Sequence, residues 1–219
     1  MKKTGYLLLV GGILLISKGA MAADPEEPEY TLLAQSDDFE LRRYDEQLIA
    51  QTWVSGDQRA ASRAGFKILA DYIFGNNTAP TGGSSKISMT APVTMQPDNN
   101  KGNSESQKIA MTAPVSMQQD DGKWRVQFTM PSKYTMETLP KPNNPEVEII
   151  ELPAQNYGVI KFSGFTGSDK VDKKTQELRN WMQSKNLTPI GDPELARYDE
   201  PWTLPFLRRN EVMIAYESE

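Results

Sequence analysis

The chain has 219 residues, a formal net charge of −5, 38% hydrophobic residues, and neither cysteine nor histidine. The absence of cysteine excludes disulfides, thiolate nucleophiles, cysteine-ligated zinc or iron–sulfur clusters, and a lipidated N-terminal cysteine. The absence of histidine excludes a Ser-His-Asp triad and imidazole metal ligands, which leaves carboxylate, Lys, Tyr and Ser/Thr chemistry, or binding alone.

Residues 1–22 have the pattern of a signal peptide. Two lysines follow the initial methionine, residues 6–16 are an apolar run, and residues 20–22 (Ala-Met-Ala) form a small-x-small cleavage site. The apolar run is too short to cross a bilayer, which takes about 20 residues. We therefore predict cleavage after Ala22, a periplasmic or secreted location, and no stable membrane insertion of the remaining chain. The alternative is an uncleaved anchor.

The chain that follows the signal peptide is acidic. Without residues 1–22 it carries 21 basic and 29 acidic residues, a net charge of −8. This balance argues against nucleic acid and anionic membrane surfaces as partners. Residues 23–29 are acidic and rich in proline, so they are expected to form a flexible lead-in. Residues 30–219 are expected to form one domain, whose oligomeric state the sequence leaves open.

Short β-like runs and two helical patterns follow in turn. Residues 58–74 carry apolar side chains at three- and four-residue spacing and end at Gly75-Asn76-Asn77, which predicts a helix on a sheet. A second helix is predicted from about Ser168, as N-cap, to about Lys185. Gly65, inside the first helix, indicates close packing or the approach of a ligand. The predicted strands are residues 39–44, 48–54, 87–93, 109–117, 124–130, 147–152, 157–162 and 211–216.

A short repeat concentrates methionine. KISMTAPVTMQ at 86–96 recurs as KIAMTAPVSMQ at 108–118, and an exposed polar loop is expected between the copies. Methionine at these positions fits three interpretations: adaptable filling of the core, a soft pocket wall for a large apolar ligand, or thioether ligands for Cu(I). The six-residue spacing within each copy makes a poor compact copper site.

Motifs for catalysis are sparse. The sequence has no Gly-x-Ser-x-Gly elbow, no P-loop and no Gly-x-Gly-x-x-Gly. The acidic pairs Asp37-Asp38 and Asp120-Asp121 lie beside turn residues, which favours a solvated face over an acid/base dyad. Arg208-Arg209 could meet an anionic group of a ligand, or form surface charge and ion pairs.

Several segments together resemble the SOUL/haem-binding-protein family. They are FELRRY (39–44), the segment 65–76, MTAPV at 89–93 and 111–115, FTMPSKY (128–134), FSGF (162–165) and ARYDEPWTLPFLRRNEVMI (196–214). The resemblance implies an α+β fold: a distorted eight-stranded antiparallel barrel-like sheet with two long helices, built from two βαββ-like halves. It also implies similarity to the effector-binding domains of some bacterial transcription regulators.

The resemblance further implies binding of haem or a related tetrapyrrole in an apolar cleft beside the first helix. Some animal members are proposed to use a histidine ligand in the segment that matches FELRRY, where this chain has Arg43. Haem would therefore be held without a histidine ligand, would not be required for folding, and no structural metal is expected. The candidate ligand-binding residues are Arg43 and Lys67 for an anionic group, and Phe66, Leu69, Ile73, Met89 and Met111 for the apolar wall.

The leading hypothesis is an exported, non-enzymatic protein that binds a small hydrophobic ligand of the tetrapyrrole kind. A second hypothesis is a scaffold that binds a different hydrophobic or cationic molecule and no haem. The third is a hydrolase that uses buried carboxylates and tyrosine, for which a pocket Glu or Asp with a raised pKa would be the supporting observation.

Overall fold

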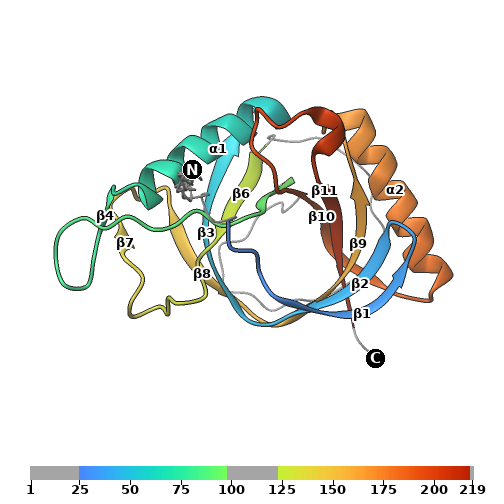
Figure 1. The fold of residues 1–219 in the computed structure, drawn as a ribbon, viewed down its shortest axis with the longest axis horizontal. Helices are drawn as coiled ribbons and strands as arrows, with labels where there is room; N and C mark the ends of the chain where they lie inside the picture. The colour runs from blue at the N-terminus through green and yellow to red at the C-terminus, as the bar shows by residue number, and fades with distance from the viewer. Residues whose placement is uncertain (1–24, 98–122, 218–219) are drawn as a thin grey trace, which may run out of the picture.

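One large antiparallel sheet and two helices make up most of the protein. The structure is a computed structural model that describes residues 25–97 and 123–217 (Figure 1). The helices are α1 (Gln58–Ile73) and α2 (Ser168–Ser184), with a short 3-10 helix, η1 (Pro205–Leu207). The strands are β1 (Tyr30–Ser36), β2 (Phe39–Tyr44), β3 (Gln47–Ser55), β4 (Asn77–Thr78), β5 (Val93–Pro97), β6 (Lys123–Thr129), β7 (Lys141–Pro142), β8 (Glu148–Leu152), β9 (Gln155–Phe162), β10 (Pro189–Arg197) and β11 (Asn210–Tyr216).

The large sheet has nine strands in the order β1-β2-β9-β11-β10-β5-β6-β3-β8, and β4 and β7 form a separate two-stranded sheet. The predicted α+β fold with two helices is confirmed. The sheet curves around an interior with both helices on its outer face, but its edge strands β1 and β8 do not pair, so it is not a closed barrel (Figure 1). The large sheet has nine strands, whereas eight were predicted.

Helix α1 begins and ends at signals in the sequence. The Asp57 side chain caps it by accepting hydrogen bonds from the backbone N–H groups of Arg59 and Ala60, at 2.9 and 2.8 Å. The helix ends before Gly75, whose φ of 132° is a conformation that side chains with a Cβ rarely adopt. The predicted helix over residues 58–74 is confirmed within one residue.

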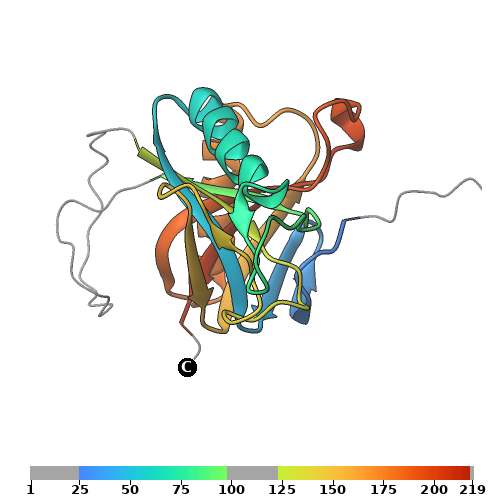
Figure 2. The same ribbon diagram turned by 90° about the vertical axis from the view of Figure 1, so that its left-hand side faces the viewer.

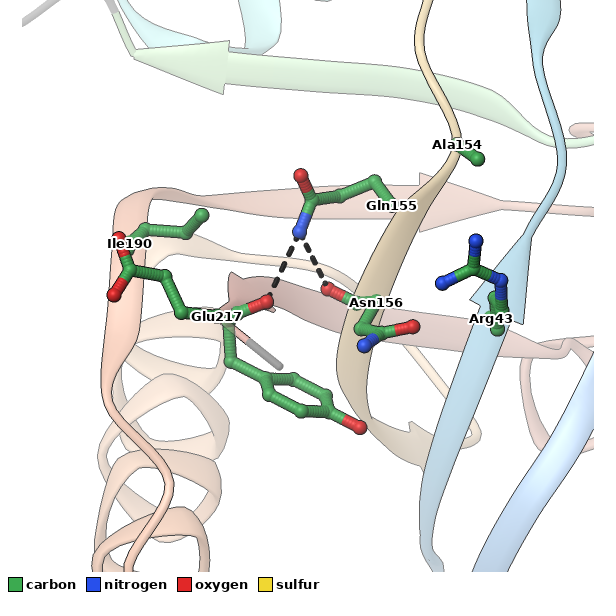
Figure 3. Close-up of a pocket in the computed structure, with 7 residues that line it drawn as sticks. Arg43, Ala154, Gln155, Asn156, Ile190 and Glu217 are labelled. Atoms are coloured by element: carbon green, nitrogen blue, oxygen red, sulfur yellow. Dashed lines mark hydrogen bonds between the residues drawn. The ribbon is translucent and has the colours of Figure 1, made fainter. Parts of the chain in front are cut away.

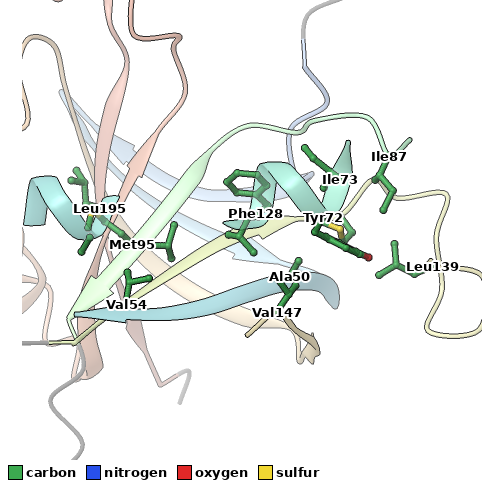
Figure 4. Close-up of a cluster of buried hydrophobic side chains, with 14 residues drawn as sticks. Ala50, Val54, Tyr72, Ile73, Ile87, Met95, Phe128, Leu139, Val147 and Leu195 are labelled. Atoms are coloured by element: carbon green, nitrogen blue, oxygen red, sulfur yellow. The ribbon is translucent and has the colours of Figure 1, made fainter. Parts of the chain in front are cut away.

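The main core lies between α1 and the strands it covers. Its buried side chains come from α1, β3, β5, β6 and β10 and from the connecting segments (Figure 4). A Cβ on Gly65 would lie 2.5 Å from Cγ2 of Val126 on β6, so this glycine lets the helix approach the sheet closely. The predicted role of Gly65 in close packing is confirmed.

Helix α2 covers the other half of the sheet, over β9 and β11. Leu178 and Met182 are buried against Ile160, Val212 and Ile214. The N-cap is Gly167, with no side-chain hydrogen bond, and Ser168 is the first helical residue, so the predicted N-cap was wrong by one position. A Cβ on Gly158 would meet Sδ of Met182 at 2.7 Å, which explains the glycine in β9. Within the described residues, no helix is long and apolar enough to cross a membrane.

Most of the predicted strands are present with small changes at their ends. The prediction for residues 87–93 was wrong, because the strand in this region, β5, begins only at Val93. Two strands of the large sheet, β1 and β10, were not predicted. The prediction for residues 109–117, the second copy of the repeat, lies outside the described residues.

Side chains alternate between the two faces of the sheet. The outer face is apolar and covered by the helices. The inner, concave face carries Glu40, Arg42, Tyr44, Gln127, Tyr157, Glu194, Tyr198 and Glu211. Most of these polar side chains are buried. The concave face is therefore unusual in that it buries polar and charged side chains.

Candidate functional site

The residues predicted on α1 lie on two faces of that helix. Leu69 and Ile73 are fully buried in the main core, whereas Phe66 is 39% exposed and Lys67 is exposed. Phe66 still makes a ring contact with Phe128, at 5.6 Å between centroids. Only Phe66 and Lys67 of this group therefore reach the surface.

The methionines of the repeat pack against the core where the structure describes them. Met95 is 1% exposed within the core, and Met89 is partly buried against the same cluster. Both observations fit the interpretation of methionine as core filling. Met111 lies outside the described residues. Within those residues, no group of three His, Cys, Asp or Glu side chains could hold a metal ion.

Arg43 lies apart from α1, in an open depression of about 260 Å³ that Ala154, Gln155, Asn156, Ile190, Tyr216 and Glu217 also line (Figure 3). The Gln155 amide donates hydrogen bonds to the backbone carbonyls of Asn156 and Tyr216 there. This lining is largely polar, and none of it comes from α1. Among the described residues, the structure therefore does not bring Arg43 together with the predicted ligand residues of α1 or with Met89.

A cluster of exposed apolar side chains lies instead on two neighbouring loops. We call it the apolar loop surface, and its exposed fractions run from 55% to 76%. Its members are Phe165, Trp202, Leu204, Phe206 and Leu207. One loop joins β9 to α2 and the other joins β10 to β11, at the end of the molecule where α1 also lies (Figure 2). Exposed apolar patches on folded domains commonly mark binding surfaces.

Hydrogen bonds fix the shape of this surface. The backbone N–H of Gly164 donates to the carbonyl of Pro205 at 2.8 Å and links the two loops. Asn210 donates from its side-chain amide to the carbonyl of Gly164 at 3.1 Å. Arg208 donates from Nε to the carbonyl of Thr203 at 2.8 Å and from Nη2 to that of Pro201 at 2.5 Å. The loops are thus held together by specific contacts while their apolar side chains face water.

The two adjacent arginines have different surroundings. Arg209 forms an ion pair with Glu27 and lies over the ring of Tyr198, 3.5 Å from its centroid. The guanidinium of Arg208 lies 5.7 Å from the ring centroid of Phe165, and no carboxylate of residues 25–97 and 123–217 lies at ion-pair distance from it. Arg208 is therefore a cation beside the apolar loop surface whose Nε and Nη2 hold the loop, and whose charge can still attract an anionic group.

On the concave face, Arg42 is the centre of a buried ionic cluster. It donates to Glu40 at 2.7 Å, to both carboxylate oxygens of Glu211 at 2.8 and 2.9 Å, and to the hydroxyl of Tyr44 at 2.9 Å. Tyr198 donates to Glu211 at 2.7 Å. Burial alone would lower the pKa of Arg42, but the hydrogen bonds and charge of Glu211 raise it above its usual value. This cluster is structural, because its charges are paired with one another.

A small cavity lies beside this cluster, around Glu194. It has a volume of about 40 Å³ and is lined by Pro28, Tyr44, Gln47, Pro92, Thr94, Gln127, Thr129, Leu152, Tyr157, Glu194 and Met213. Glu194 accepts one hydrogen bond from Arg125, at 3.2 Å. Burial raises the pKa of Glu194, against the opposing charge of Arg125, and the charge of Glu194 and burial together raise the pKa of Tyr157. A carboxyl of this kind is what the hydrolase hypothesis required, but the cavity has room for only about three water molecules.

Neither the apolar loop surface nor the cavity was predicted as a site. The loop residues stand inside the quoted segment 196–214, where the alternation of Trp, Leu, Pro and Phe next to two arginines was the available signal. Glu194 gave no signal, because β10 itself was not recognised.

The fold places the protein in the α+β class, with a curved antiparallel sheet and helices on its outer face. The family model described as SOUL heme-binding protein matches the sequence over residues 25–102 and 99–215. The chain therefore belongs to the SOUL heme-binding protein family. A search of curated proteins finds no significant match.

Solved structures share the fold at low sequence identity. The C-terminal domain of EcmrR is 12% identical, with a TM-score of 0.56, over 87% of this chain and 99% of that one. EcmrR in a complex with DNA is 9% identical, with a TM-score of 0.57, over 83% of this chain and 57% of that one. A hydrolase from Listeria innocua is 12% identical, with a TM-score of 0.50, over 89% and 94% of the two chains. At these identities the likeness concerns the fold alone.

Proposed function

We propose that the protein binds a tetrapyrrole, haem or a close relative, on the apolar loop surface, and that it acts as a binding protein rather than an enzyme. The observation that carries the proposal is the group of exposed side chains of Trp202, Phe206 and their neighbours next to Arg208, which has no carboxylate partner among the described residues. A tetrapyrrole is flat and apolar over its ring and carries carboxylates at one edge. Apolar side chains beside a guanidinium without a carboxylate partner in the described part of the chain match both parts.

The small volume of the cavity on the concave face favours a tetrapyrrole site on the surface of the protein. The cavity of about 40 Å³ around Glu194 has room for only a few water molecules, so a tetrapyrrole cannot lie there. Membership of the SOUL heme-binding protein family supports the ligand class. The apolar loop surface supplies five large apolar side chains, each at least 55% exposed, that a ring system could contact.

The residues at this surface fit a tetrapyrrole held through its ring and carboxylates. The chain has no histidine or cysteine to bind iron, and the side chains of the surface are apolar except for Arg208. Most of the binding free energy would then come from apolar burial, about 25 cal/mol per Å², before the cost of association. Haemin and iron-free protoporphyrin are therefore expected to bind with dissociation constants within about threefold of each other.

Titration with haemin, followed by the Soret band and by tryptophan fluorescence, tests the proposal. Replacing both Trp202 and Phe206 by Ser removes two large aromatic contacts and should weaken binding by about tenfold or more. Phe66→Ser is the matched control, since Phe66 is an exposed aromatic residue on α1. Absence of saturable binding, or a loss with Phe66→Ser but not with the double variant, would contradict the site.

We also propose that the protein is exported and that residues 1–22 are removed. The support is the sequence pattern of a basic start, a short apolar run and Ala-x-Ala. Mass spectrometry of the protein from the periplasmic fraction would show a chain that begins at Ala23, and a chain that begins at Met1 would contradict the proposal.

A further inference from the structure

The cavity around Glu194 lies on the concave face of the sheet, on the side of the strands opposite the helices. Its lining comes from several strands and from Pro28, in the segment before β1. That segment is anchored beside the cavity. The backbone N–H of Ala91 donates to the carbonyl of Glu26 at 2.9 Å, and the side chain of Glu26 accepts from the N–H of Ser132 at 2.8 Å. The cavity is therefore a feature of the packed fold and is separate from the apolar loop surface.

One buried oxygen atom of its lining has no hydrogen-bond partner among residues 25–97 and 123–217, and a carboxylate beside it has only one. Gln127, which is 6% exposed, has a buried Oε1 that accepts no hydrogen bond. Glu194 is 9% exposed and accepts one hydrogen bond from Arg125, at 3.2 Å, so its carboxylate keeps lone pairs for further donors. Leaving the buried Oε1 of Gln127 unsatisfied is costly, and a group that donates hydrogen bonds to it and to the Glu194 carboxylate would remove that cost.

The other lining residues indicate what kind of donor fits. The rings of Tyr44 and Tyr157 meet edge to face at 5.7 Å, and both line the cavity together with Met213. Aromatic rings and a thioether are favourable neighbours for an organic cation. Pro28, Pro92 and Leu152 are apolar members of the same lining, suited to a short alkyl chain. A primary ammonium group combines a positive charge with three N–H donors.

We infer that this cavity binds the head of a small primary alkylammonium ion, with its N–H groups donating to Glu194 and to Oε1 of Gln127 and its alkyl chain against Leu152, Pro28 and Pro92. The volume of about 40 Å³ limits the enclosed part to the ammonium head and its first carbons. This site is independent of tetrapyrrole binding, because the two surfaces share no residue.

Thermal unfolding and calorimetric titration with n-butylammonium chloride test the inference. Tetramethylammonium chloride at equal ionic strength is the matched probe, since it carries the same charge but no N–H donor. Butylammonium should raise the unfolding temperature and bind saturably, and tetramethylammonium should do neither. Glu194→Gln should weaken binding by about tenfold or more, because a charge-assisted hydrogen bond is lost. Glu151→Gln, on an exposed carboxylate of β8, should leave it unchanged.

A second measurement does not depend on a variant. In protein with 13C-labelled methionine methyl groups, butylammonium should shift the methyl resonance of Met213, which lines the cavity, and leave that of the core residue Met130 in place. Equal effects of the two salts, no saturable binding of butylammonium, or binding unchanged in Glu194→Gln would each overturn the inference and leave the cavity a site for ordered water only.

Discussion

Two groups of buried charges lie on the concave face of the sheet, and they differ in how fully their hydrogen bonds are satisfied. Around Arg42, the guanidinium meets two carboxylates and a tyrosine hydroxyl, and Glu211 also accepts from Tyr198. Around Glu194, one contact at 3.2 Å joins the carboxylate to Arg125. Within residues 25–97 and 123–217, Nε of Arg125 and Oε1 of Gln127 have no hydrogen-bond partner.

The difference separates a structural cluster from a candidate binding site. Buried charges that satisfy one another hold strands together, here β2 to β11, and leave nothing for a ligand to satisfy. Buried polar atoms without partners next to a cavity lower the stability of the empty protein. They form hydrogen bonds when a ligand fills the cavity, so they favour binding. The concave face therefore carries a stabilising ionic cluster around Arg42 and, around Glu194, polar atoms that a ligand could satisfy.

The largest effect is expected when the cluster around Arg42 is broken. Arg42→Met leaves Glu40 and Glu211 buried without their common partner and should lower the free energy of unfolding by about 3–5 kcal/mol. Arg209→Met, which removes the exposed ion pair with Glu27, should cost only about 0–1 kcal/mol. Urea denaturation of both variants makes the comparison, and similar losses would show that the Arg42 cluster is not a structural support.

Acid should act on the two clusters in opposite directions. Burial would raise the pKa of Glu40, but hydrogen bonds from Lys161 and Arg42 outweigh it and hold the pKa below its usual value. Stability from Glu40 is therefore present above about pH 4.5 and is lost as the pH falls through the lowered pKa. The pKa of Glu194 is raised, so its contribution to the free energy of unfolding has the opposite dependence on pH. It is present below about pH 4.5 and is lost as the pH rises from there.

Unfolding free energies measured from pH 3 to pH 7 test this contrast. Glu40→Gln should flatten the acid side of the profile, and Glu194→Gln should flatten the fall that begins above about pH 4.5. If neither variant changes the profile, the two carboxyls do not titrate differently in the folded and unfolded protein.

The smallest expected effect is a gain in stability when the unpaired amide oxygen near Glu194 is removed. Gln127→Leu removes the unpaired Oε1 at similar volume and should raise the free energy of unfolding by about 1 kcal/mol. Gln51, whose Oε1 is also unpaired, donates from Nε2 to Glu148 at 2.9 Å, so Gln51→Leu should show no such gain. Chemical denaturation measures both. A loss of stability in Gln127→Leu would mean that its amide is satisfied in solution.

Helices and regular strands were predictable from local patterns. Residues 58–74 combined an apolar stripe with a glycine stop just after them, and each signal acts within a few residues of the chain. Strand β10 was missed because Pro189, Gly191 and Pro193 are typical of turns. The structure accommodates them through a shift in register against β11 between Ile190 and Glu194. Such an irregularity depends on the partner strand and has no local signal.

The candidate sites were less predictable than the fold, for the same reason. Leu69 and Phe66 are both apolar residues of one helix, and only the position of the sheet decides that the first is buried and the second exposed. The apolar loop surface depends on a backbone contact between residues 164 and 205. Glu194 becomes notable only when Arg125, Gln127 and Tyr157, from two other strands, surround it. Sequence patterns do not report such long-range neighbours.

The strand order also has a consequence for how the chain folds. The last strand, β11, lies inside the sheet between β9 and β10, and β10 pairs with β5, joining Leu195 to Met95 across most of the domain. The two halves of the sheet thus meet only when the C-terminal residues are available. Pairing between such distant segments makes folding slow and places it late in synthesis. A nascent chain that stops before Asn210 would leave the facing edges of β9 and β10 without their partner strand and open to chaperones and proteases.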